Sequence, residues 1–220
     1  MRKKIIKVAI DSPAAAGAGT QAKLISKKYN LFYLDTGKIY RLIGENYLKN
    51  NNKIKIINLK KKIKNLSIKN LSRKNLLTDK IGTAASIVAK NKSIRNLVHK
   101  FQLNCAYNPP KKFNGSCLDG RDCTYKIVPD ADFKFYITAN IKIRAKRRYL
   151  ELKKLKKKTS YPEVLKSIKI RDKNDKTRKI SPLKKTKDSI LINTTNLSKR
   201  ACFLKIKKIM DKKLKINGNI

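Results

Sequence analysis

The chain has 220 residues and carries 57 Lys and Arg against 14 Asp and Glu, which gives a formal net charge of +43. This length suits one domain with a lid or an insert, and a hydrophobic content of 40% argues against a disordered chain. No apolar run approaches the ~20 residues of a membrane span, and the apolar stretch after the basic start is too short for a signal peptide.

The net charge by itself suggests a nucleic-acid partner. It comes from 46 Lys and only 11 Arg, and these residues are spread over the whole chain instead of forming a tail. The chain is also rich in Ile and Asn, which share A/T-rich codons with Lys, so a biased base composition accounts for much of the charge. We therefore expect solvated surface lysines and no specific nucleic-acid partner.

The first 50 residues alternate between strand and helix patterns. Residues 5–10 predict a buried strand, and a loop of small residues follows at 11–20. A helix is predicted at 21–28, a second strand at 31–34, and another helix from about 38 to 49. This order is typical of an α/β domain with a doubly wound parallel sheet, which binds its ligands at the carboxyl ends of the strands.

The middle of the chain changes character. Residues 50–80 are dense in Lys, Asn and Ile, and the alternation from Lys53 through Lys55 to Ile56 predicts an inserted subdomain of short strands. A helical pattern from 82 to about 107 is stopped by Asn108-Pro109-Pro110. The remaining predicted elements are strands at 116–119, 133–138 and 189–194 and helices at 141–155 and 198–213.

The small-residue loop after the first strand is where a parallel sheet can bind a phosphate. Small side chains let backbone N–H groups approach an anion, and the following helix N-terminus adds a partial positive charge. The loop matches the pattern G-x-x-x-x-G-K-[ST] imperfectly, because Gly17 fits but Ser12 replaces the first Gly and Ala18 replaces the Lys. A tight alanine-rich packing turn would use the same residues, so the loop alone leaves both interpretations open.

Arginines gather near the predicted strand ends and on the later segments. Arg is the side chain suited to bidentate phosphate contacts. Eight of the 11 Arg belong to this set, namely Arg41, Arg95, Arg121, Arg144, Arg147, Arg148, Arg171 and Arg178. In a chain that otherwise uses Lys, this concentration indicates an anionic ligand, although Arg147 or Arg148 taken singly could merely solvate a helix.

Five stretches together resemble the bacterial cytidylate kinases, a branch of the nucleoside-monophosphate kinase family. The stretches are VAIDSPAAAGAGTQAKLISKKYNLFYLDTGKIYR, GTAASIVAK with Arg95 after it, CLDGRD with VPDADFKFYITA, IRAKRRYLELK, and RDKNDKTRKISPL. They extend from residue 8 to about 200. The most specific parts are LDTGxxYR, DGRD and RDxxDxxR.

The resemblance implies a single nucleoside-monophosphate kinase domain over 1–220 with a P-loop kinase-type fold. The core would comprise 1–49 and 81–220, with an acceptor-binding insert at about 50–80 and a helical lid at about 147–170. The implied reaction moves the γ-phosphoryl of ATP to CMP or dCMP with Mg²⁺. No residue is assigned as a metal ligand.

The resemblance also implies three groups of site residues. The donor loop that binds ATP comprises Ser12, Pro13, Ala14, Ala15, Ala16, Gly17, Ala18, Gly19 and Thr20. The acceptor nucleotide is expected to contact Asp35, Thr36, Arg41, Ser86, Arg95, Arg121, Asp122, Arg171, Asp175 and Arg178. Catalytic roles are expected for Arg121, Asp122, Arg147, Arg148 and Arg178.

The chain departs from the family pattern mainly in the donor loop. The family carries Lys at Ala18 and Gly at Ser12, while Cys-Thr-Tyr at 123–125 replaces Ile-Gly-Thr and Leu103 replaces an Arg. Three explanations remain for the missing lysine. A neighbouring cation replaces it (Lys23, or one of Arg144, Arg147 and Arg148), the kinase is slow, or the chain is a nucleotide-binding pseudoenzyme. The intact acceptor motifs favour the first two.

Two alternative functions remain open. A basic RNA- or ribosome-associated protein is one, although the chain has no RNP-like aromatic strand and no zinc-finger spacing. Kinase activity on UMP or AMP is the other. The four cysteines lack CxxC spacing, so we expect reduced thiols in a cytoplasmic protein. The resemblance further implies a monomer that uses ATP, CMP and dCMP, without a membrane partner.

Overall fold

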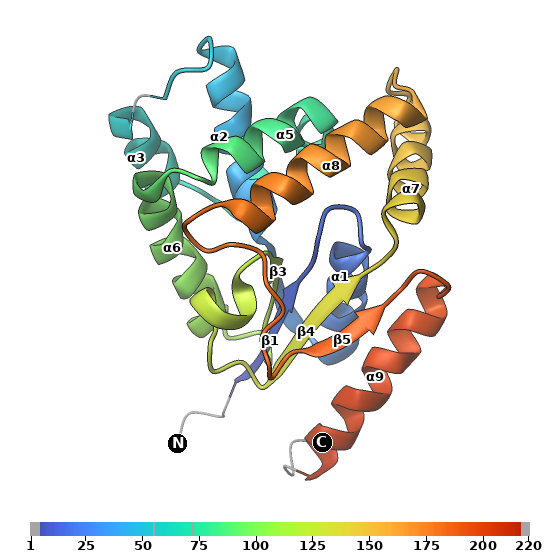
Figure 1. Ribbon diagram of the computed structural model, residues 1–220. Coiled ribbons are helices and arrows are strands. Elements are labelled where there is room, and N and C mark those ends of the chain that lie inside the picture. The colour runs from blue at the N-terminus through green and yellow to red at the C-terminus, as the bar shows by residue number, and fades with distance from the viewer. Residues whose placement is uncertain (1–4, 55, 72, 217–220) are drawn as a thin grey trace.

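The computed structural model describes residues 5–54, 56–71 and 73–216. Its centre is a five-stranded sheet whose strands all run parallel, in the order β2-β3-β1-β4-β5 (Figure 1). The strands are β1 Ile6–Asp11, β2 Leu31–Asp35, β3 Gly115–Gly120, β4 Phe133–Thr138 and β5 Ile190–Asn193. The predicted α/β fold with a doubly wound parallel sheet is therefore confirmed.

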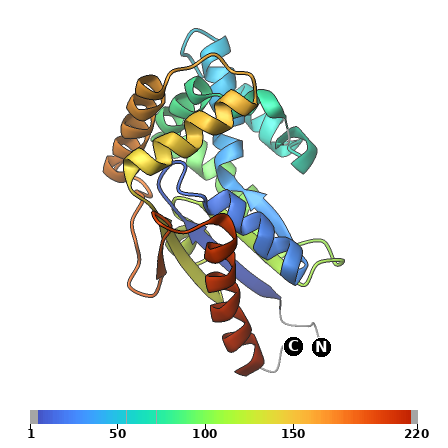
Figure 2. The same ribbon diagram turned by 90° about the vertical axis from the view of Figure 1, so that its right-hand side faces the viewer.

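Helices cover both faces of the sheet. The helices outside residues 50–78 are α1 Ala18–Tyr29, α2 Thr36–Lys49, α5 Asp79–Val88, α6 Lys92–Tyr107, α7 Ile141–Lys154, α8 Tyr161–Thr177 and α9 Lys199–Ile216, of which α7 and α8 lie above the sheet in Figure 1. Along β1, Val8 and Ile10 pack with α1 and α9, which lie side by side (Figure 2), whereas Ala9 packs with α2 and α6. This alternation gives the sheet a core on each face.

Strand register brings polar residues together at one edge of the sheet. Asp11 lies opposite Gly120, and Asp35 lies opposite Asp119. The loop between β1 and α1 rises from this edge toward α8 (Figure 1). Ala14 of that loop shares a small apolar cluster with α7 and α8, formed with Ala145, Leu152, Val164 and Ile168.

The predicted short strands at 50–80 are wrong. This segment forms α3 Ile56–Lys64, α4 Ile68–Leu71 and the 3₁₀ turn η1 Lys74–Leu77. Leu59 and Ile63 lie one helical turn apart and are buried in the core shared with α6, so helical spacing outweighs the short alternation. Lys55, which belonged to that alternation, lies outside the described residues.

Two further elements differ from the sequence prediction. The single helix predicted from 82 to about 107 is two helices, because the Asn91 side chain accepts a hydrogen bond from Ile94 N at 3.1 Å and caps α6. Helix α8 was not predicted, although Ser160 and Glu163 form a capping box at its start. Among the described residues, no helix is long and apolar enough to cross a membrane.

Candidate active site

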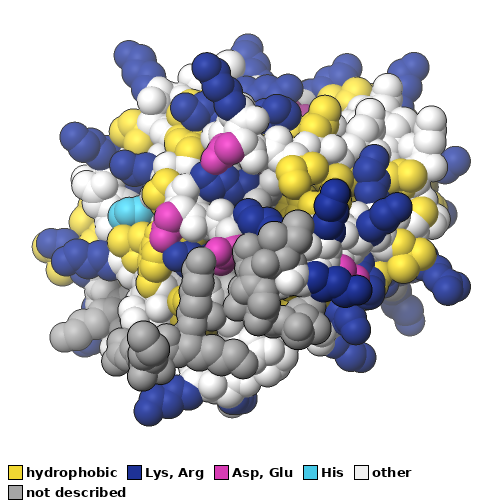
Figure 3. All heavy atoms as spheres, turned by 90° about the horizontal axis from the view of Figure 1, so that it is seen from below, with side chains coloured by type: hydrophobic (Ala, Val, Ile, Leu, Met, Phe, Trp, Pro, Cys, Tyr) yellow, Lys and Arg dark blue, Asp and Glu magenta, His cyan; other side chains and the backbone are white. Residues whose placement is uncertain are grey.

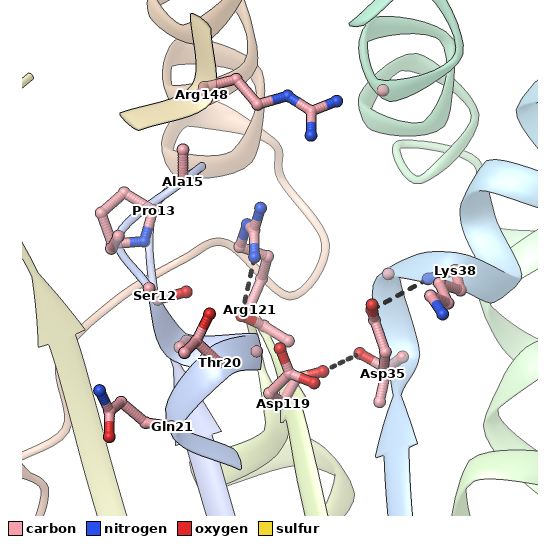
Figure 4. Close-up of a pocket in the computed structure, with 18 of the residues that line it drawn as sticks. Ser12, Pro13, Ala15, Thr20, Gln21, Asp35, Lys38, Asp119, Arg121 and Arg148 are labelled. Carbon is pink, nitrogen blue, oxygen red and sulfur yellow. Dashed lines mark hydrogen bonds between the residues drawn. The ribbon is translucent and has the colours of Figure 1, made fainter. Parts of the chain in front are cut away.

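A cavity of about 890 Å³ opens at the carboxyl ends of the strands. Figure 4 shows Pro13 of the loop after β1 on one side and Asp35 at the end of β2 on the other. Arg121 stands between them, and Arg148 reaches in from α7 above. The cavity therefore lies between the loop after β1, the ends of β2 and β3, and helices α7 and α8.

The structure brings the sequence-predicted site residues together around this cavity. From the donor loop, Ser12, Pro13, Ala15, Ala16, Gly17, Ala18, Gly19 and Thr20 line it. From the other segments, Asp35, Thr36, Arg41, Ser86, Arg121, Asp122, Arg147, Arg148, Arg171, Asp175 and Arg178 line it. Ala14 and Arg95 do not line the cavity. Ala14 is fully buried against α7 and α8, and Arg95 is buried and pairs with Asp122.

The donor loop has the backbone of an anion site. Gly17 has a φ of 92° and caps α1 without any side-chain hydrogen bond, and Ala15 has a φ of 58°. Left-handed residues in a tight loop are typical of concave arrays of N–H groups. The first turn of α1 carries no acidic side chain that would compete with an anion.

The three arginines of α7 near the cavity already have protein partners. Ala18 is the first residue of α1 and lines the cavity. Arg144 pairs with Asp172 at 2.7 Å, Arg147 donates to Thr194 Oγ1 at 2.9 Å, and Arg148 pairs with Asp79 at 3.0 Å. Lys23, by contrast, lines the cavity, is exposed, and has no ion pair among the described residues.

Two carboxylates meet beside the first turn of α1. Asp119 ends β3 next to Asp35, and its Oδ1 is buried without a hydrogen-bond partner. Burial, and next the charge of Asp35, raise the pKa of Asp119 well above its ordinary value. A β-carbon at Gly19 would lie 3.3 Å from Asp119 Oδ2, so the lack of a side chain there lets α1 approach the carboxylate.

Arginines crowd the side of the cavity below α5. Burial, and next the charge of neighbouring arginines, lower the pKa of Arg41 to about 9 and that of Arg171 to about 10. Gly82 makes room for them, since a β-carbon there would lie 3.0 Å from Arg41 Nη2 and 3.2 Å from Arg171 Cζ. Asp79 is close to the cluster but leaves its Oδ2 unpartnered. Such a cluster is stabilised by a bound anion.

A second charged group spans β3 and the end of α8. Arg121 Nε donates to Asp175 Oδ2 at 2.7 Å, and Arg178 Nη1 donates to Asp175 Oδ1 at 3.3 Å. Asp122 pairs with Arg95, whose guanidinium lies 5.4 Å from the centre of the Tyr40 ring. These pairs fix the directions of the side chains that face the cavity.

The carboxylate of Asp11 binds the segment after β3. No spacing in the sequence links Asp11 to that segment. Asp11 accepts hydrogen bonds from Cys123 N at 2.8 Å, Thr124 N at 2.9 Å and Thr124 Oγ1 at 2.6 Å. This segment, a π-helix at Cys123–Ile127, follows Arg121 and Asp122 directly. Asp11 therefore holds two predicted site residues in place without lining the cavity itself.

Comparison with known proteins decides the family. The family model described as cytidylate kinase matches residues 8–212. The chain belongs to the cytidylate kinase family. It is 38% identical to the cytidylate kinase of Thermosipho melanesiensis over 220 residues, covering 96% of this chain and 99% of that protein. It is 41% identical to the cytidylate kinase of Bartonella tribocorum over 199 residues, covering 89% and 90% of the two chains.

A solved structure shares the fold of this cytidylate kinase family member. The crystal structure of an uncharacterized protein from Eubacterium ventriosum matches with a TM-score of 0.54 at 17% identity, over 94% of this chain and 99% of the other. At that identity the likeness shows the fold alone. The cytidylate kinase of Mesomycoplasma hyopneumoniae strain 7448 is 36% identical over 225 residues, which is 96% of each chain.

Three residues of this cytidylate kinase family member were missed by sequence reasoning. Asp11, Asp79 and Asp172 each hold a part of the site through contacts between segments far apart in the chain. Asp172 was visible in the RDxxDxxR motif, and Asp79 follows Thr78 at the N-cap of α5. The sequence around these three residues did not indicate which residues they would contact.

Proposed function

We propose that the protein transfers the γ-phosphoryl of ATP to CMP or dCMP, releasing ADP and CDP or dCDP, with Mg²⁺. One observation carries this proposal: a single cavity joins a phosphate-type loop at a helix N-terminus to a cluster of buried arginines. Two anionic substrates can meet there, and the chain belongs to the cytidylate kinase family.

On the donor side, the backbone N–H groups of the loop at 12–20 bind the phosphates of ATP. The partial positive charge of the α1 N-terminus adds to them. Arg147 and Arg148 of the lid face the same cavity and neutralise charge on the transferring phosphoryl group. In this chain backbone groups carry a larger share of ATP binding, because Ala18 supplies no cation.

On the acceptor side, Arg41 and Arg171 bind the phosphate of CMP, since their crowded positive charges are relieved by an anion. Ser86, Asp122 and Arg178 face the cavity further along and read the base and sugar. The remaining contacts proposed for the acceptor are Asp35, Thr36, Arg95, Arg121 and Asp175. An oxygen of the acceptor phosphate then attacks the γ-phosphorus in line with the departing ADP.

Asp35 and Asp119 are the residues that would hold Mg²⁺. The buried Oδ1 of Asp119 lacks a partner, and a cation there would reverse the unfavourable charge of the carboxylate pair. Mg²⁺ is usually held by one or two carboxylates together with substrate phosphates and waters, so two acidic residues suffice. When bound, the ion supplies charge neutralisation on the phosphate oxygens.

A coupled assay with ATP, Mg²⁺ and CMP tests this function, with dCMP, UMP and AMP as competing acceptors. We expect CMP and dCMP to give the highest kcat/KM. A rate equal to the enzyme-free blank with every acceptor would refute the kinase and leave a nucleotide-binding pseudoenzyme, which titration with ATP would detect.

We further infer one kinase domain acting as a monomer in the cytoplasm. The four cysteines are buried thiols without disulfides, which suits a reducing compartment. Light scattering of the purified protein measures the mass, and a dimer in the working concentration range would contradict the monomer.

A further inference from the structure

We propose that Arg144 and Asp172 are positioning residues that hold the donor loop in its phosphate-binding shape. Arg144 on α7 and Asp172 on α8 hydrogen-bond to Ala14 of the loop, and we call these contacts the grip on Ala14. The next residue, Ala15, has a left-handed backbone conformation. The inference rests on the proposed function, because it concerns how the donor loop binds ATP.

The grip involves both peptide groups of one residue. Ala14 N donates to Asp172 Oδ1 at 3.0 Å, and Arg144 Nη1 donates to Ala14 O at 2.8 Å. Arg144 and Asp172 pair with each other at 2.7 Å, and Arg144 Nε also donates to Ala139 O at 2.9 Å. One closed set of contacts thus joins the loop, the end of β4, α7 and α8.

These contacts lie away from water and away from the substrates. Ala14 is fully buried, and Arg144 and Asp172 are 5% and 7% exposed. Neither charged residue lines the cavity. A buried ion pair of this kind is weak evidence of added stability, so its hydrogen bonds to the loop indicate its role better. Their role is therefore to place the loop and not to touch a nucleotide.

The residue after Ala14 explains why the loop needs this grip. Ala15 has a φ of 58°, in the left-handed region that an alanine avoids and a glycine accepts. Such a conformation persists only where the surroundings enforce it. The grip on Ala14 fixes the peptide group that precedes Ala15. Without that grip, we expect Ala15 to relax and turn the loop N–H groups away from the phosphates.

The absence of the loop lysine increases the importance of this shape. With Ala18 in place of a cation, the backbone N–H groups supply most of the attraction that the loop offers to ATP. Their directions are set by the loop conformation alone. A loosened loop should therefore weaken ATP binding and leave the acceptor side, built on α2, α5 and α8, nearly unchanged.

The test is the variant Asp172→Asn, with Ala15→Gly as a rescue. Ala14 N bonds to Oδ1 of Asp172 and Arg144 pairs with Oδ2. In Asn one of these two positions is an NH₂ group, which donates and cannot accept, so one of the two contacts is lost. We expect the Kd of ATP, measured by titration calorimetry, to rise about tenfold, while the Kd of CMP changes less than twofold. Adding Ala15→Gly should restore most of the ATP affinity, because glycine adopts the left-handed conformation without the grip. Ala15→Gly alone gives the reference Kd of ATP against which the double variant is compared.

Two controls make the result decisive. Arg144→Lys keeps the charge but loses the guanidinium fork, so it should reproduce the ATP defect even if Asp172→Asn folds poorly. Asp188→Asn removes an exposed carboxylate that pairs with Lys134, and should leave both affinities unchanged. Equal losses for ATP and CMP, or a defect that Ala15→Gly does not repair, would overturn the positioning role. Binding is measured without turnover, so failure of the kinase assay is a separate outcome.

Discussion

At the scale of single residues, Ala18 is the position where this chain departs most from its family. A unit charge about 4 Å from a phosphate oxygen is worth roughly 4 kcal/mol at an effective dielectric of 20. The three arginines of α7 already bind protein partners, and these contacts compete with any contact to the donor phosphates. Of the lysines on α1, Lys23 is the one that lines the cavity.

Ala18→Lys should raise kcat/KM for ATP by about tenfold or more. The new ammonium would extend from the first residue of α1 into the cavity that Ala18 lines. The rate is measured by the coupled assay at saturating CMP. Ala18→Met, which has similar length and no charge, separates the effect of the cation from that of the added bulk. No gain over Ala18→Met would show that the site has been rebuilt around the absence of a lysine.

Lys23→Met should lower kcat/KM for ATP by about tenfold and leave KM for CMP unchanged. Lys23 lies one helical turn after Gly19, on the helix face that approaches Asp119, and its charge lowers the pKa of that carboxyl. Steady-state kinetics with each nucleotide varied in turn measure the effect.

The matched control for Lys23→Met is Lys199→Met, a cavity-lining lysine on α9. Equal effects of the two substitutions would mean that Lys23 has no special place at the donor phosphates. In the Ala18→Lys background, Lys23→Met should lose most of its effect, because the new cation makes it redundant.

At the scale of elements, prediction from sequence worked where the apolar pattern was long and local. The strand, loop and helix around the donor loop were predicted within a few residues, because β1 is a short run rich in β-branched residues followed by small residues. At 50–80 the alternation of polar and apolar residues is short. This segment is helical because helical spacing lets Leu59 and Ile63 pack together into the core. Asp11 could not be connected to Thr124, because that contact spans 113 positions in the chain.

The contact between β1 and the segment after β3 predicts a pH dependence of stability. Burial raises the pKa of Asp11 to about 6, from 3.8 in the unfolded chain. Between these values the folded state binds more protons than the unfolded state, so the free energy of unfolding falls as the pH rises. One pKa unit corresponds to about 1.4 kcal/mol, so Asp11 accounts for a loss of about 2.4 kcal/mol between pH 4 and pH 7.

Urea unfolding of the wild type and Asp11→Asn across this pH range measures the effect. The stability of the variant minus that of the wild type should rise by about 2.4 kcal/mol from pH 4 to pH 7. Asp188→Asn is the control without a pH-dependent difference in this range, because its lysine partner lowers the pKa of Asp188 and the group is ionised in both states above about pH 5. A difference that stays constant with pH for Asp11→Asn would contradict a raised pKa.

At the scale of the whole molecule, two kinds of basic residue have separate places. Lys and Arg side chains are scattered over the face seen in Figure 3, among apolar and uncharged groups. The buried arginines, including Arg144, Arg148, Arg171 and Arg178, lie in and around the active-site cavity. The sequence count of +43 mixes these two sets, which is why it first suggests a polyanion partner.

The scattered lysines predict weak and unselective binding to nucleic acid. Each phosphate neutralised by a lysine releases counterions, so a protein with about 6–10 such contacts loses roughly 10³–10⁵ in affinity between 50 and 200 mM salt. Fluorescence anisotropy with two single-stranded RNAs of equal length and different sequence measures this. We expect a steep fall with salt and affinities within about twofold of each other at every salt concentration. A complex that resists salt and prefers one sequence would instead require a shaped RNA site, and the even spread of lysines offers no reason for one.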